Sequence, residues 1–225
     1  MNLTLHHAHD WAVTPEAAVM IQRQLAPLVR EEPLATPPQS IAGVDMSVRG
    51  DQVQAAVVLL RYPDLTVIEQ AIWQGQVEFP YVPGLLSFRE VPAVLRALQQ
   101  LSTMPDLIMC DAQGRAHPRR FGLASHLGVL LEWPTVGVAK SLLTGHHTEL
   151  AATKGAHVPL RAGAETIGAV VRSRTAVNPL YVSVGHRITL PEAINLTLAC
   201  TTRYRLPEPT RQAHLLSKTQ DGDDV

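Results

Sequence analysis

The sequence predicts an α/β fold in which helices cover both faces of a mixed sheet. Three apolar segments joined by very short turns begin the expected core and indicate an antiparallel meander. Beyond them, apolar strands alternate with helical segments across short links, which is typical of parallel pairing. With 225 residues, 46% of them hydrophobic, the chain can bury a substantial core as a single domain.

The N-terminal part, residues 1–39, is expected to place a helix and a linker in front of that core. The helix is predicted over residues 14–32, because Thr14 is a favourable N-cap and Pro15 suits the first helical position. Prolines are frequent over residues 33–39 and indicate the linker.

The core is expected over residues 40–219, followed by a frayed acidic tail at 220–225. The meander strands are predicted at residues 40–48, 52–63 and 65–76, and a turn-rich connection occupies residues 77–88. Helices are then predicted over residues 89–101, 118–133, 189–202 and 208–219, and strands over 106–111, 134–140, 166–174 and 179–186. Thr189 and Glu192 form a capping-box pattern at one helix start.

Composition restricts the classes of function. The formal net charge is -1, so no global field attracts nucleic acid, and a nucleic-acid-binding protein of this composition needs a local basic patch. Arg115, Arg119 and Arg120 form such a patch in the sequence. Either these arginines bind phosphate or they form an ordinary solvated face.

The cysteines and the first residues indicate a cytoplasmic protein. Cys110 and Cys200 lie far apart in apolar sequence and are expected to be reduced core thiols. The start of the chain lacks the layout of a signal peptide, and no segment is long and apolar enough to span a membrane. The "HHAH" run at residues 6–9 is either a metal site or, as is commoner at a chain end, a loose polar lead.

Two aspartates belong to apolar strands. Asp45 interrupts the first core strand, and Asp111 ends the strand over residues 106–111. A buried charge is costly unless it is paired or binds a metal, and a divalent cation relieves the repulsion between two facing carboxylates. Such oxygen ligands favour Mg²⁺ or Mn²⁺. The alternative is that Asp45 lies at a strand end and Asp111 caps a turn.

The residues alone leave the role of Glu90 open. "SFRE" (87–90) matches a capping box, in which Glu90 would accept a hydrogen bond from a backbone N–H at the helix start. Pro92 would then remove a hydrogen bond early in the helix. In the alternative, the helix starts after Ser87 and Glu90 points toward Asp45.

Three further side chains are candidates for substrate contacts. His117 and Lys140 can stabilise negative charge in a transition state, although a lysine at a strand end more often extends into solvent. Tyr81 stands between two prolines in a stiff loop, which suits insertion of its ring between stacked bases or, alternatively, packing on the core. Gly84, in the same loop, permits a close approach of the backbone to a ligand.

Several of these segments together resemble the endonuclease V family. They are "GVDMS" (43–47), "PYVPGLLSFRE" (80–90), "DAQGRAHPRRFGLASHLG" (111–128), "GVAKSLL" (137–143) and "LPEPTRQAH" (206–214), in the order and at distances typical of that family. The resemblance implies a ribonuclease H-like fold. It also implies a monomer that nicks DNA one nucleotide 3′ of deaminated bases such as deoxyinosine, leaves 3′-hydroxyl and 5′-phosphate ends, and initiates repair. Mg²⁺ is the implied cofactor, with Mn²⁺ able to substitute.

The resemblance also assigns roles to individual residues. The metal ligands implied by the resemblance are Asp45, Glu90 and Asp111, with His214 near the metals. His117 and Lys140 would lie beside the reacting phosphate. Tyr81 would be the wedge that enters the base stack, and Arg89 and Arg119 would make further contacts with the substrate. The pocket for the flipped base would be formed by Gly84, Leu86, Ala112 and Leu123. At Ala112 the family usually has glycine. Base recognition would change if the glycine conformation were needed there, and would change little if only the N–H were used.

Two other functions are compatible with the same residues. An inosine-specific ribonuclease, or another structure-specific nuclease on this fold, would use the same carboxylates and differ only in its preferred substrate. A nucleic-acid-binding module without catalysis would need the carboxylates to lie apart from one another.

Overall fold

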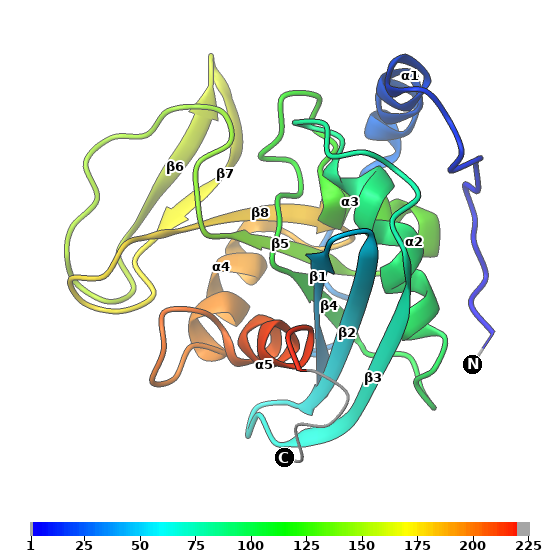
Figure 1. Ribbon diagram of the computed structural model, residues 1–225. Helices are drawn as coiled ribbons and strands as arrows, with labels where there is room; N and C mark the ends of the chain where they lie inside the picture. Colours follow the sequence, from blue (N-terminus) through cyan, green and yellow to red (C-terminus); the bar gives the residue numbers. More distant parts are fainter. Residues whose placement is uncertain (1, 220–225) are drawn as a thin grey trace.

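An eight-stranded mixed sheet forms the centre of the computed structural model, which describes residues 2–219 (Figure 1). The strands lie in the order β3-β2-β1-β4-β5-β8-β7-β6. Their bounds are β1 (Ser40–Arg49), β2 (Gln52–Arg61), β3 (Val67–Gln76), β4 (Leu107–Cys110), β5 (Thr135–Ala139), β6 (His157–Ala162), β7 (Glu165–Val171) and β8 (Leu180–His186). The predicted α/β class is confirmed, while the predicted tail at 220–225 lies outside the described residues.

Strand pairing follows the predicted meander and then departs from a simple alternation. β1, β2 and β3 pair antiparallel, as expected from their short joints. Parallel pairing is limited to β1 with β4 and β4 with β5, whereas β8, β7 and β6 extend the sheet antiparallel. β6 was not predicted, because this edge strand contains Pro159 and half of its residues are exposed, so it has no apolar run.

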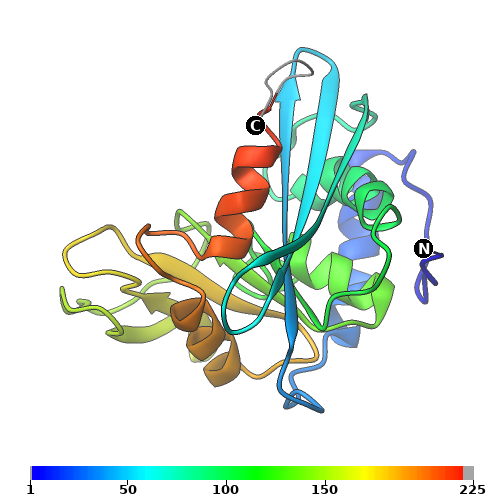
Figure 2. The same ribbon diagram turned by 90° about the horizontal axis from the view of Figure 1, so that it is seen from below.

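Helices cover both faces of the sheet. On one face lie α1 (Pro15–Leu25), α2 (Leu86–Leu98) and α3 (Leu123–Leu131), and on the other lie α4 (Leu190–Ala199) and α5 (Glu208–Leu216) (Figure 2). The predicted N-cap Thr14 and the capping box of Thr189 with Glu192 are both present. The first helix is shorter than predicted, because it gives way to a 3-10 turn, Ala26–Leu28, that contains Pro27.

Two other helix starts differ from the sequence prediction. α2 begins at Leu86 with Leu85 as N-cap, so the capping box at Ser87 and the later helix start are both wrong. α3 begins at Leu123 instead of residue 118, because the preceding loop is packed into the fold. A Cβ atom on Gly114 would lie 2.1 Å from the Val184 carbonyl oxygen, which shows how closely this loop approaches β8.

β1 carries core residues on both of its faces. Ala42 and Val44 belong to the core under α2 and α3, and Ile41 belongs to the core under α4. Between them, a Cβ atom on Gly43 would lie 1.8 Å from the Pro209 carbonyl oxygen. The start of α5 therefore packs directly on the β1 backbone, and the helix then runs along the strand toward Asp45.

The cysteine prediction is confirmed, since Cys110 and Cys200 are both buried and free. In residues 2–219 no helix combines the length and the apolar character needed to cross a membrane.

The predicted loose lead at residues 6–9 is wrong. The His6 N–H donates to the Leu130 carbonyl, and His9 Nε2 lies 2.7 Å from His126 Nε2, so the segment is held against α3. In residues 2–219, the group of side chains close enough to share a metal ion is Asp45, Asp111 and His214. The histidines at residues 6–9 do not belong to it.

Candidate active site

The register of the central parallel strands brings two carboxylates together. β1 and β4 pair Gly43 with Met109 and Val44 with Cys110. Extending this register by one residue places Asp45 beside Asp111. The side chains of alternate residues in a strand point to the same face, so both aspartates point to the face that α5 covers. This is also the carboxyl edge of the parallel strands, where ligands bind in α/β sheets.

α5 adds His214 to this pair. Each of Asp45, Asp111 and His214 offers a ligand atom within 4.8 Å of the other two. His214 Nδ1 lies 3.1 Å from Asp45 Oδ2, and the Ser217 hydroxyl donates to the same oxygen at 2.7 Å. Ser217 was not predicted as a site residue. It carries no motif, and only the packing of α5 on β1 brings it to the aspartate.

Lys140 points toward the carboxylates instead of extending freely into solvent. Its ammonium forms an ion pair with Asp111 Oδ2, a buried oxygen to which no other group in residues 2–219 donates a hydrogen bond. Burial raises the pKa of Asp111 above its ordinary value, although Lys140 opposes this change. The lysine thus places a positive charge directly beside the buried carboxylate of Asp111.

Glu90 reaches the same region from α2, on the other face of the sheet. It lies outside the group of three residues with mutually close ligand atoms. Burial and, secondarily, the charges of Asp45 and Asp111 raise the pKa of Glu90 to about 8. The charges of both aspartates thus act on Glu90 from across the sheet, and the later helix start that was expected to turn Glu90 toward Asp45 is wrong.

A cavity of about 140 Å³ is lined by Ala112, the residue that follows Asp111. Its walls come from the loop before α2, the first turn of α2, and the segment after β4. The cavity brings together six predicted residues, namely Tyr81, Gly84, Leu86, Ala112, His117 and Leu123. Seven other residues that were not predicted also line it, and the polar ones among them are Gln22, Ser87 and Gln113. Arg89 lies elsewhere, in a depression with Trp73, Glu78 and Arg96.

His117 belongs to the wall of this cavity and not to the carboxylate group. Its Nδ1 accepts a hydrogen bond from the Arg119 backbone N–H at 3.2 Å, and its Nε2 lies 3.0 Å from the Gly84 carbonyl oxygen. Burial, and then the charge of Arg119, lower the pKa of His117 to about 4. The ring is therefore neutral at pH 7, with Nε2–H donating to Gly84.

Comparison with known proteins decides the family. The family model for endonuclease V matches residues 23–215. Endonuclease V of Nostoc punctiforme is 52% identical over 221 residues, which cover 97% of this chain and 100% of that relative. The chain belongs to the endonuclease V family. Members of this family are nucleases, so this endonuclease V is a hydrolase.

Solved structures agree with this family and its ribonuclease H-like fold. Endonuclease V of Streptomyces avermitilis has a TM-score of 0.88 and 44% sequence identity, covering 97% of this chain and 96% of that one. A structure of Ciona intestinalis endonuclease V, in complex with a 23-mer DNA containing an inosine followed by a ribo-adenosine, has a TM-score of 0.79. At 24% identity, covering 92% of this chain and 97% of that one, it shows a shared fold.

Ala112, the departure from the family pattern, has an ordinary backbone. Positive φ angles occur at five non-glycine residues of the described chain, and Ala112 is not among them. Alanine is thus accommodated without strain, and its methyl group adds to the wall of the cavity. In this endonuclease V the position does not require the conformational freedom of glycine.

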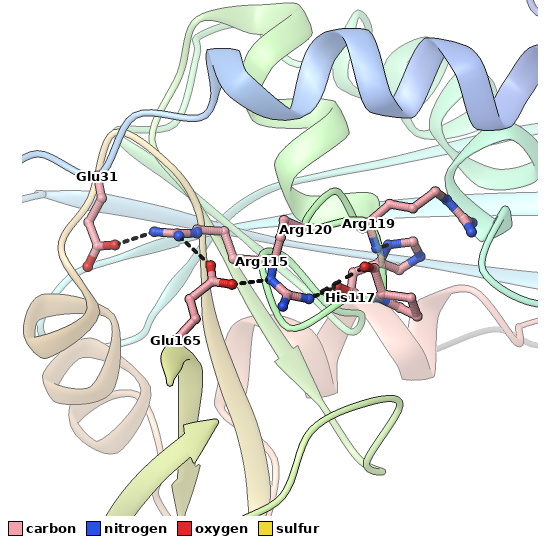
Figure 3. A network of polar contacts seen from close by, with 7 residues as sticks. Glu31, Arg115, His117, Arg119, Arg120 and Glu165 are labelled. Carbon is pink, nitrogen blue, oxygen red and sulfur yellow. Dashed lines mark hydrogen bonds and ion pairs between the residues drawn. The ribbon is translucent and has the colours of Figure 1, made fainter. Parts of the chain in front are cut away.

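The three arginines of the predicted basic patch have different partners (Figure 3). Arg115 forms ion pairs with Glu31 and Glu165, and Arg120 pairs with Glu165 as well. Arg119 has no carboxylate partner among residues 2–219, and instead donates to the Gly84 carbonyl. Two of the three positive charges are therefore largely neutralised. Arg119 donates to the Gly84 carbonyl and Arg120 to the His117 carbonyl, so both contact the cavity wall.

Proposed function

We propose that this endonuclease V nicks DNA one nucleotide 3′ of a deaminated base such as deoxyinosine. The products would carry 3′-hydroxyl and 5′-phosphate ends and would enter DNA repair. The observation that carries the proposal is the adjacency of two sites: Asp111 belongs to the acidic group, and the next residue, Ala112, lines the cavity. The inosine-containing DNA bound by the Ciona relative supports the choice of substrate.

The acidic group fits a divalent cation. Asp45, Asp111 and Glu90 would hold Mg²⁺, or Mn²⁺ in its place, with His214 beside them. Oxygen donors predominate, as these ions prefer, and the buried Asp111 Oδ2 has Lys140 as its charged partner among the described residues. When bound, such a cation polarises a phosphate and lowers the pKa of water.

The side chains of this endonuclease V would handle the base and the phosphate. Leu86, Leu123 and Ala112 give the cavity apolar walls that exclude water from a flipped base. Tyr81 is 69% exposed at the edge of the cavity and would fill the gap that the base leaves in the stack. Flipping costs a few kcal/mol, less for a weakly paired base, which favours deaminated sites. Lys140 would balance negative charge near Asp111.

A nicking assay tests the proposal. Matched DNA and RNA oligonucleotides, with and without one inosine, are incubated with the protein in Mg²⁺ and in EDTA. We expect one Mg²⁺-dependent cut in the DNA, one nucleotide 3′ of inosine. Asp111→Asn should cut at least ~100-fold more slowly, because charge stabilisation at the reacting phosphate is lost, while it still binds DNA. Preference for the RNA strand would favour an inosine-specific ribonuclease, and rapid cutting by Asp111→Asn would contradict the metal assignment.

A further inference from the structure

Gln22 connects the two walls of the base cavity. This residue belongs to α1, outside the carboxylate group, and its side chain is 1% exposed. Its amide nitrogen donates to the Gly84 carbonyl and to the Phe121 carbonyl, both at 3.1 Å. Gly84 belongs to the loop that carries Tyr81, and Phe121 belongs to the segment after β4. One amide group therefore spans loops that lie far apart in the sequence.

The other end of the same amide is also occupied. Gln22 Oε1 accepts a hydrogen bond from Arg119 Nε at 2.5 Å, and Arg119 also donates to the Gly84 carbonyl at 2.6 Å. Together with His117, three donors converge on that one carbonyl oxygen. A carbonyl offers two lone pairs, so this oxygen is saturated and the orientation of its peptide group is fixed.

Fixing this peptide matters because of its conformation. Gly84 has a φ of 79°, and a Cβ atom there would lie 2.7 Å from an Arg119 nitrogen. A side chain at position 84 would therefore be strained and would clash with Arg119. The loop reverses at this glycine, where its carbonyl accepts hydrogen bonds from Gln22, His117 and Arg119. His117 and Arg119 also join the Gly84 loop to the segment after β4, and Gln22 adds the one amide group that contacts both Gly84 and Phe121.

We propose that Gln22 is a positioning residue that sets the width of the base cavity, and with it the preference among deaminated bases. The inference rests on the proposed function of the same cavity. Gln22 acts through Gly84 and Phe121 and does not enter the chemistry at the phosphate. Its loss should therefore change how the lesion is held more than how fast the bond is cut.

Single-turnover nicking separates these effects. Gln22→Leu keeps the size of the side chain and removes every hydrogen bond, and Gln22→Glu keeps the acceptor for Arg119 but loses the donor. For both variants we expect the half-saturating enzyme concentration on inosine DNA to rise about tenfold, with the maximal rate changed less than about twofold. The preference for inosine over uracil should decrease. The matched control is Gln24→Leu, which changes an exposed glutamine of the same helix and should behave as wild type.

Hydrogen exchange gives a readout that does not depend on cleavage. Amides of residues 81–87 should exchange faster in Gln22→Leu than in wild type and in Gln24→Leu. Unchanged exchange together with an unchanged preference would overturn the proposal, as would wild-type behaviour of Gln22→Glu. A merely misfolded fraction would lower the amplitude of cutting without changing the preference. Failure of the wild type to cut inosine DNA would refute the proposed function, while the exchange would still decide the role of Gln22.

Discussion

Glu90 is the side chain whose surroundings most alter its ordinary acid chemistry. Burial and, secondarily, the charges of Asp45 and Asp111 raise the pKa of this carboxyl from 4.5 to about 8. The folded state thus binds the proton more tightly than the unfolded state does. This tighter proton binding adds to the free energy of unfolding. The addition is complete below the unfolded pKa of 4.5 and is lost as the pH rises through the folded pKa of about 8.

Metal-free melting therefore tests the environment of Glu90. In EDTA, the melting temperature of wild type should fall relative to that of Glu90→Gln as the pH rises from about 5 to about 9. Glutamine has no proton to lose, so the variant lacks this dependence. Parallel curves for the two proteins would contradict the raised pKa. Because a cation favours ionised Glu90, we also expect the half-saturating Mg²⁺ concentration to decrease with rising pH.

Individual residues could be predicted from the sequence where a strand dictates their place. Asp45, Asp111 and Lys140 belong to the central strands or follow them, so the parallel arrangement that brings these strands together also gathers their side chains. Gln22 and Ser217 could not be predicted in this way. Their contacts depend on how α1 and α5 pack against distant segments, and no local pattern specifies that packing.

Among the secondary-structure elements, those with local signals were predicted best. Thr14 and Thr189 accept hydrogen bonds within their own first helical turn, so the sequence indicates both helix starts directly. The start of α3 was missed because tertiary contacts of the preceding loop determine it. β6 was missed for a related reason, since an edge strand is defined by its partner β7 more than by its own composition.

The first turn of α2 joins the cavity to the N-terminal segment. The Ser87 hydroxyl lies 3.0 Å from His126 Nδ1, and His9 contacts the other nitrogen of that ring at 2.7 Å. Trp11 and Phe88 pack around the two histidines. Residues near the start of the chain therefore support the helix from which both Leu86 and Glu90 extend.

The loop before α2 carries the next prediction. Tyr81 extends from this loop into solvent beside the cavity, so stacking on bases would be its main use there. Tyr81→Ala should weaken binding to inosine-containing DNA by about tenfold, because stacking contributes roughly 1–3 kcal/mol per base. Tyr81→Phe keeps the ring and should bind like wild type. Fluorescence anisotropy with labelled oligonucleotides measures the DNA affinity of wild type and both variants. Equal affinity of all three proteins would contradict the role of Tyr81 as a wedge.

At the scale of the whole molecule, the acidic site unites parts that are remote in the sequence. Asp45 comes from β1, Asp111 follows β4, Glu90 comes from α2 and His214 comes from α5. These groups converge only in the folded state, and the unfolded chain offers no comparable site. A cation that binds there must therefore stabilise the fold by mass action.

The thermal stability of the folded protein should consequently depend on divalent metal. At a Mg²⁺ or Mn²⁺ concentration of about ten times Kd, the gain is roughly 1.4 kcal/mol, which for a chain of this size raises the melting temperature by about 3–6 °C. Asp45→Asn should lose this shift, because it removes one charged ligand from the group. Asp51→Asn changes an exposed aspartate in the turn after β1 and should keep the full shift. An equal shift in Asp45→Asn and wild type would mean that the cation binds elsewhere, and the assignment of Asp45 as a ligand would then be wrong.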